Sequence, residues 1–165
     1  MLGKGRAEAI SPAHMAALAD EIKCHPADLE AIAKVESGGF GWDRKGRIKI
    51  LFEKHWFYKL LTGDKRRKAV SKDLARRKWI SPKRGGYKEQ NTSDRKYRIL
   101  QQAMDIDDNA ALQSISMGTY QIMGFNYRKA GFRTVHDMWD RFRDSEVNQL
   151  QGFRNVLIAF GLKQA

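Results

Sequence analysis

The chain of 165 residues has the length of one domain, and 42% hydrophobic with 30% charged residues is the composition of a folded globular protein. Its one cysteine, Cys24, excludes an internal disulfide framework and a zinc finger, and no apolar run is long enough to cross a membrane. The net charge of +12 is extreme and indicates an anionic partner, either nucleic acid, an acidic membrane face or an acidic wall polymer.

Helical spacing of apolar residues predicts two helices near the N-terminus. Ser11 is the expected N-cap of the first, with Pro12 in its first turn. After a break at His25-Pro26, the segment 27–37 predicts a second helix, which ends at the glycine pair 38–39. The residues expected on its inward face are Leu29, Ile32, Ala33 and Val35.

The next segment, 40–53, reads "FGWDRKGRIKILFE" and predicts a short β-hairpin. Its "DRKG" supplies turn residues, with Asp43 assigned to the turn, and Ile48, Ile50 and Phe52 alternate with other residues as in a strand. The following "KHWFYKLLTGD" predicts a helix that stops at Gly63.

The remainder of the chain is predicted to be mostly helical. A basic, weakly periodic stretch runs from residue 65 to 87, and a helix capped by Ser93 follows it. The stretch 110–123 mixes small and apolar residues and is interrupted by Gly118. We therefore expect one domain over residues 1–165, of the α+β class, predominantly α-helical with a small β-hairpin.

Glu36 stands at the end of the second predicted helix, where the negative end of the helix dipole disfavours a second negative charge. One explanation is a solvated residue in the last helical turn. The other is functional: the helix end and apolar surroundings keep the carboxyl protonated, as general-acid cleavage of a glycosidic bond requires.

Two stretches, "AIAKVESGGF" at 31–40 and "SMGTYQIMGFNY" at 116–127, together resemble the lysozyme-like superfamily of goose-type lysozymes and lytic transglycosylases. The resemblance is closer to the N-acetylmuramidase family of bacteriophage endolysins. In that family "ILFEKHWFY", "SPKRGGY" and "MGTYQIMGFNYRKAGF" have counterparts in the same order. The likeness runs from about Ile10 to the C-terminus and implies a lysozyme-like fold. It also implies that residues 1–165 form a single catalytic muramidase domain, and we expect no separate wall-binding module.

Carried over to this sequence, the resemblance implies that Glu36 is the catalytic acid. It implies for Glu53 one of three roles: second catalytic carboxylate, substrate ligand, or structural ion-pair partner. It also implies that a group of residues faces the sugar cleft, although Tyr120 fits the protein core equally well. This group comprises Ser37, Ser116, Gly118, Tyr120 and Gln121. Gly118 would let the backbone approach the saccharide, and Gln121 would hydrogen-bond an N-acetyl group or a water.

The implied substrate is the β-1,4 bond between N-acetylmuramic acid and N-acetylglucosamine in peptidoglycan. Three routes stay open after protonation by Glu36: attack by water, attack by the substrate's own N-acetyl group, or attack by the muramyl 6-hydroxyl as in a lytic transglycosylase. No cofactor is expected. The four histidines lack the i, i+4 spacing of a helical zinc site, so no metal is expected either.

Residues 44–98 hold 20 of the 31 basic residues and only 5 of the 19 acidic ones. We define residues 65–88 as the basic segment. Three interpretations are open for it: a nucleic-acid binder without catalysis, a solvated helical face, or a contact to the anionic cell envelope. A monomer is expected. Since the N-terminus lacks a secretory signal, the resemblance implies storage in the host cytoplasm until lysis, followed by action in the periplasm on the cell wall.

Overall fold

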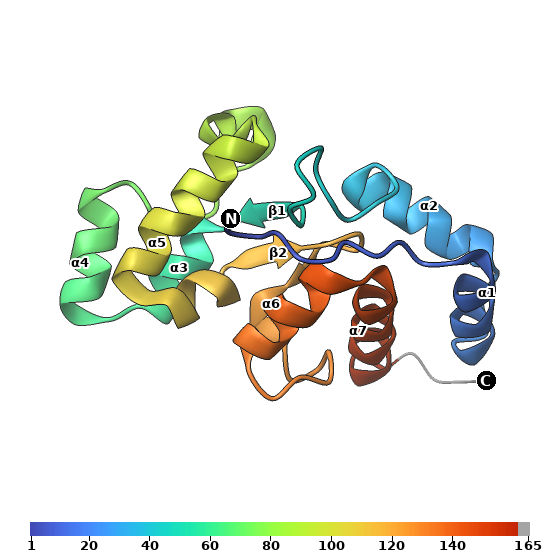
Figure 1. The fold of residues 1–165 in the computed structure, drawn as a ribbon. Coiled ribbons are helices and arrows are strands. Elements are labelled where there is room, and N and C mark those ends of the chain that lie inside the picture. The colour runs from blue at the N-terminus through green and yellow to red at the C-terminus, as the bar shows by residue number, and fades with distance from the viewer. Residues whose placement is uncertain (162–165) are drawn as a thin grey trace.

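Helices dominate the computed structural model, which describes residues 1–161 (Figure 1). The helices are α1 (Pro12–Glu21), α2 (Pro26–Ser37), α3 (Lys54–Leu60), α4 (Gly63–Ser71), α5 (Ser93–Gln113), α6 (Val135–Asp144) and α7 (Glu146–Ala159). The strands are β1 (Ile50–Phe52), β2 (Ile115–Met117) and β3 (Ile122–Met123), and short 3₁₀ helices occupy Pro82–Arg84, Lys88–Gln90 and Gly124–Asn126. The predicted α+β class with predominant helix is therefore confirmed.

The two N-terminal helices begin and end as their sequence signals predict. The Ser11 side chain accepts a hydrogen bond from the backbone N–H of His14, and α2 ends at Gly38 in the left-handed conformation, with φ 75°. The inward face of α2 is narrower than predicted. Val35 is 84% exposed and Ile32 37% exposed, because the buried stripe of α2 runs through Leu29 and Ala33, four residues apart. Val35 comes two residues after Ala33 and therefore lies on the opposite side of the helix.

The sheet is built differently from the predicted hairpin. A turn does form at residues 43–46, but the two flanking segments share only an isolated bridge, Trp42 to Ile48. β1 pairs antiparallel with β2, and β2 pairs antiparallel with β3. The stretch 110–123, assigned to the mostly helical half, therefore supplies two strands, because β1 provides the hydrogen-bonding partner that local sequence does not reveal.

Two helix boundaries also differ from the prediction. Gly63 begins α4 instead of ending the preceding helix, which stops at Leu60. The N-cap of α5 is Thr92, whose side chain accepts from the backbone N–H of Arg95, so Ser93 is the first helical residue. Within residues 1–161, no helix combines the length and apolarity needed to cross a membrane.

The small sheet lies between two groups of helices (Figure 1). In this view α3 and α4 are on the left, whereas α1, α2 and α7 are on the right, with α1 packed against both α2 and α7. The long α5 packs against β1, α3, α4 and α6, so it ties the sheet to the left-hand group. This arrangement brings together the C-terminal end of α2, the residues at the start of β1 and the start of α5.

Candidate functional site

A cavity of about 310 Å³ forms where the end of α2 faces the start of α5. Segments far apart in the sequence line it, and three of the residues predicted for the site are among them. The lining residues are Glu36, Ser37, Asp43, Lys49, Ile50, Asn91, Thr92, Ser93, Lys96 and Gln121. Glu36, Ser37 and Gln121 therefore share one cavity, as the predicted site requires.

The Glu36 side chain is exposed and forms no hydrogen bond or ion pair with another residue in the described range 1–161. The left-handed turn at Gly38 leads the chain away directly after it, which leaves one side of the carboxyl open. The apolar surroundings predicted for Glu36 are thus not present. The accessible carboxyl instead faces a cavity where a ligand could cover it.

Gln121 is held rigidly in the same cavity. Its backbone adopts φ 46°, a left-handed conformation that is unfavourable for a residue other than glycine. The side-chain oxygen accepts from Ser116 Oγ at 2.8 Å, and Nε2 donates to the Gly118 carbonyl at 2.8 Å. Ser116 therefore acts on the cavity through Gln121 and does not line it.

Asp43 forms the predicted turn, since its Oδ1 accepts from the backbone N–H groups of Lys45 and Arg47 at 2.9 and 3.0 Å. It also lines the cavity, where Oδ2 accepts from Ser93 Oγ and from Arg47 Nε. Burial works to raise the pKa of Asp43, but the hydrogen bonds from Ser93 and Arg47 outweigh it and hold the pKa below its usual range. An ionised carboxylate is thus fixed in the cavity that Glu36 also lines.

Glu53 is not among the residues that line the cavity. It caps the start of α3, where the Tyr87 hydroxyl donates to its carboxylate and lies 2.9 and 2.8 Å from the two oxygens. Its other partner is His55, with Nδ1 at 3.2 Å, and Trp79 Nε1 donates to Tyr87 at 2.9 Å. Burial raises the pKa of Glu53 against the opposing effect of the Tyr87 hydrogen bond. Of the three roles considered, this environment favours the structural one, with tyrosine and histidine as partners.

Gly118 and Tyr120 also face away from the cavity. Gly118 has φ 81°, and a Cβ there would lie 2.6 Å from Gln149 Oε1, so the close neighbour is an internal side chain rather than a saccharide. Tyr120 is buried, with its ring stacked on Phe153 at 4.6 Å between centroids. The alternative assignment of Tyr120 to the core is thus the one that the structure supports.

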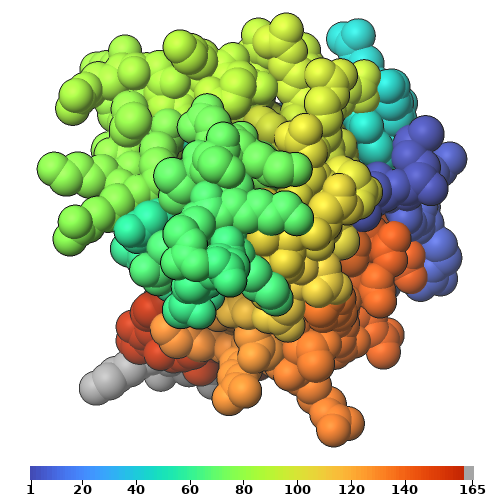
Figure 2. All heavy atoms as spheres, turned by 90° about the vertical axis from the view of Figure 1, so that its left-hand side faces the viewer, coloured from blue at the N-terminus to red at the C-terminus, as the bar shows by residue number. Residues whose placement is uncertain are grey.

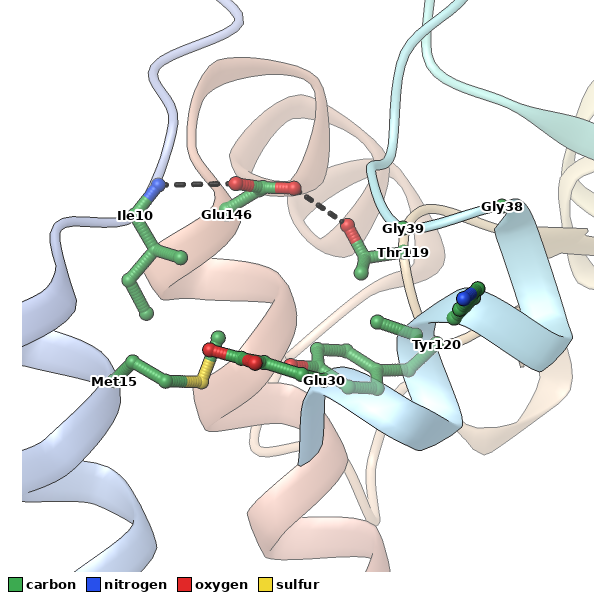
Figure 3. A pocket seen from close by; sticks show the side chains of 10 residues that line it. Ile10, Met15, Glu30, Gly38, Gly39, Thr119, Tyr120 and Glu146 are labelled. Atoms are coloured by element: carbon green, nitrogen blue, oxygen red, sulfur yellow. Dashed lines mark hydrogen bonds between the residues drawn. The ribbon is translucent and has the colours of Figure 1, made fainter. Parts of the chain in front are cut away.

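Tyr120 borders a second pocket, of about 270 Å³, on another side of α2 (Figure 3). Glu30 and Met15 lie beside it there, and the Glu146 carboxylate closes the far end. That carboxylate accepts from the backbone N–H of Ile10 at 3.0 Å and from the Thr119 hydroxyl at 2.9 Å. Because its oxygens are already occupied, Glu146 holds segments together and leaves little capacity for a ligand.

Sequence reasoning missed the two lysines of the cavity, Lys49 and Lys96. Lys49 alternates with apolar residues before β1, which marks it only as an outward-facing strand residue. Lys96 reaches the cavity because α5 docks there, a placement with no local signal. Within residues 1–161, no cluster of three or more His, Cys, Asp or Glu side chains is placed to hold a metal ion.

The basic segment lies on the face shown in Figure 2, where its green to yellow-green atoms occupy the centre and upper left, beside the yellow atoms of α5. Part of its charge is paired, as in Lys65 with Asp107 and Arg67 with Asp64. Other cations are exposed and have no ion-pair partner anywhere in the described chain. These are Lys68, Lys72, Arg77, Lys78, Lys83, Arg84 and Lys88.

Comparison with known proteins finds similarity to a protein family and to solved structures. Residues 25–165 match the N-acetylmuramidase family. Among solved structures, the crystal structure of the Burkholderia AP3 phage endolysin is similar, with a TM-score of 0.75 and 30% sequence identity. The likeness covers 96% of this chain and 58% of the endolysin, so this chain spans less than two thirds of that protein's length. No curated protein matches this chain.

Proposed function

Because this chain belongs to the N-acetylmuramidase family, we propose that it degrades peptidoglycan by cleaving the β-1,4 bond between N-acetylmuramic acid and N-acetylglucosamine. The observation that carries the proposal is the cavity shared by Glu36, Ser37 and Gln121. The likeness to a phage endolysin at 30% identity supports the same substrate class.

Glu36 acts as the general acid in this proposal. A glycan seated in the cavity covers the exposed carboxyl and displaces water from it. The carboxyl then donates its proton to the leaving glycosidic oxygen while positive charge develops on the sugar ring. Gln121, fixed by Ser116 and the Gly118 carbonyl, presents its remaining hydrogen-bonding capacity to the N-acetyl group or to a water.

Asp43 supplies the negative charge that the second half of the reaction needs. Its lowered pKa keeps it ionised, and a fixed carboxylate in the cavity stabilises an oxocarbenium-like centre. Its oxygens already accept several hydrogen bonds, which makes direct nucleophilic attack by Asp43 unfavourable. We therefore assign completion of the reaction to water, giving hydrolysis.

The catalytic assignment is tested with Glu36→Gln, which removes the proton but keeps the side chain's size. Glu30→Gln is the matched control, because Glu30 is an exposed glutamate of the same helix that lines the other pocket. Clearing of a purified peptidoglycan suspension is expected to be lost in the first variant and kept in the second, while both still sediment with the wall. Clearing by Glu36→Gln would disprove the assignment.

The bond and the attacking group are tested by mass spectrometry of the released muropeptides. Reducing N-acetylmuramic acid ends are expected. Anhydro-muramyl ends would instead identify a lytic transglycosylase, and reducing N-acetylglucosamine ends would place cleavage at the other linkage.

We also propose that the exposed cations of the basic segment concentrate the enzyme on the anionic cell envelope after its release from the host cytoplasm. Replacing Lys83 and Arg84 by glutamate reverses two unpaired charges in a 3₁₀ turn. Binding to whole envelopes is expected to weaken at low salt, and hydrolysis of soluble glycan fragments to stay unchanged. Tight binding of random DNA at physiological salt, lost in the same variant, would favour the nucleic-acid interpretation instead.

A further inference from the structure

Two lysine ammonium groups line the proposed catalytic cavity in different settings. Lys49 Nζ donates to the Ser37 carbonyl at 2.5 Å, at the end of α2, and lies 4.1 Å from the centroid of the Phe40 ring. Lys96 comes from the second turn of α5 and is half-buried. Among the described residues it has neither a hydrogen bond nor an ion pair for its ammonium group.

The acidic residues nearby do not neutralise this pair. Asp43 is occupied by Arg47, Ser93 and two backbone N–H groups. Neither Lys49 nor Lys96 forms an ion pair with Glu36 within the described part of the chain. Burial lowers the pKa of both lysines; the Asp43 charge partly opposes this for Lys49, and the charge of Lys49 lowers the pKa of Lys96 further. Positive charge without a partner is therefore concentrated in the cavity.

This charge is unfavourable for the proposed reaction unless an anion accompanies it. The sugar ring becomes positive in the transition state, and a nearby ammonium group opposes that change. N-acetylglucosamine carries no charge, so a chitin-like glycan brings no compensating group. N-acetylmuramic acid does, because its lactyl ether ends in a carboxylate or in a peptide stem that carries carboxylates.

We propose that Lys49 and Lys96 bind a carboxylate carried on the lactyl substituent of N-acetylmuramic acid and thereby select peptidoglycan over uncharged glycans. The inference rests on the proposed function, because it places the glycan in the cavity of Glu36. Charge-assisted hydrogen bonds from ammonium to carboxylate are strong and directional, and partial burial limits their screening by salt.

Binding by the inactive Glu36→Gln protein separates this inference from catalysis. Calorimetry would compare four soluble probes: glycan fragments with intact peptide stems, the same fragments with amidated carboxyls, fragments stripped to the free lactyl carboxylate, and N-acetylglucosamine oligomers. Amidation is expected to weaken binding about tenfold, the loss of one charge-assisted hydrogen bond. The stripped fragments distinguish the lactyl carboxylate from those of the stem.

Adding Lys96→Met to the Glu36→Gln protein should abolish the effect of amidation on affinity and leave binding of the uncharged oligomers unchanged. Adding Lys96→Arg should preserve the effect of amidation. Lys34→Met is the control, since Lys34 lines the neighbouring pocket. An equal loss for charged and uncharged probes would assign Lys96 a role in cavity shape and overturn the inference, as would an undiminished effect of amidation. A circular dichroism spectrum and a Tm that match those of the wild type establish that a variant is folded. Should Glu36→Gln retain lysis, the catalytic assignment fails while this binding result stands.

Discussion

The guanidinium group of Arg47 supports the wall of the cavity, and its removal gives a sharp prediction. It is 7% exposed and donates from Nε to Asp43 at 2.8 Å and from Nη2 to Asp94 at 2.7 Å and to Ser93 Oγ at 3.1 Å. Arg47→Met keeps the packing volume but leaves the Asp43 carboxylate buried without its cation. Breaking a buried pair in this way costs about 3–5 kcal/mol of unfolding free energy.

For a chain of this length, that loss lowers Tm by about 6–20 °C. Thermal and urea unfolding followed by circular dichroism measure it. Lys45→Met is the matched control, because Lys45 also pairs with Asp94, at 2.8 Å, but both side chains are more than half exposed. The exposed pair is expected to contribute much less to stability, because water and salt screen it. Equal losses in the two variants would refute the reasoning that burial of the partner sets the cost.

Two further predictions concern stability and pH. Gly118→Ala should cost at least about 2 kcal/mol in urea unfolding, because φ is 81° and the new Cβ would lie 2.6 Å from Gln149 Oε1; an unchanged midpoint would contradict this. Burial raises the pKa of Glu53, so the folded state holds this proton more tightly than the unfolded chain, and stability falls as pH rises through the raised pKa. Glu53→Gln should reduce the stability difference between about pH 5 and about pH 8, and a difference as large as in the wild type would count against it.

Local signals predicted the helical framework well, because caps and glycines act within a few residues. Ser11 and Gly38 bound their helices as expected. The failures have a common cause. β2 and β3 exist because β1 pairs with β2, a contact across the whole of α5. Likewise Val35 follows Ile32 at i, i+3 spacing, but tertiary packing buries the face of Leu29 and Ala33, from which Val35 points away.

The residues of the site could be predicted only in part, because the local sequence does not show which segments pack around the cavity. Glu36 and Gln121 were identified by resemblance to known sequences, and the cavity brings them together. Lys96 carried no signal, since an isolated lysine on a basic helix is usually solvated. The resemblance assigned Gly118 and Tyr120 to the cleft, but the turn between β2 and β3 places them against Gln149 and Phe153 instead.

The carboxylate of Glu146 joins segments from the beginning and the end of the polypeptide. It accepts from the N–H groups of Ile10 and Gly41 and from the Thr119 hydroxyl. During translation these three donors lack their shared acceptor until Glu146, the first residue of α7, has left the ribosome. A nascent chain, or one truncated before α7, would lack the Glu146 hydrogen bonds that hold the end of α2 next to the turn between β2 and β3, which carries Gln121. The arrangement of these segments is therefore complete only once Glu146 has been synthesised.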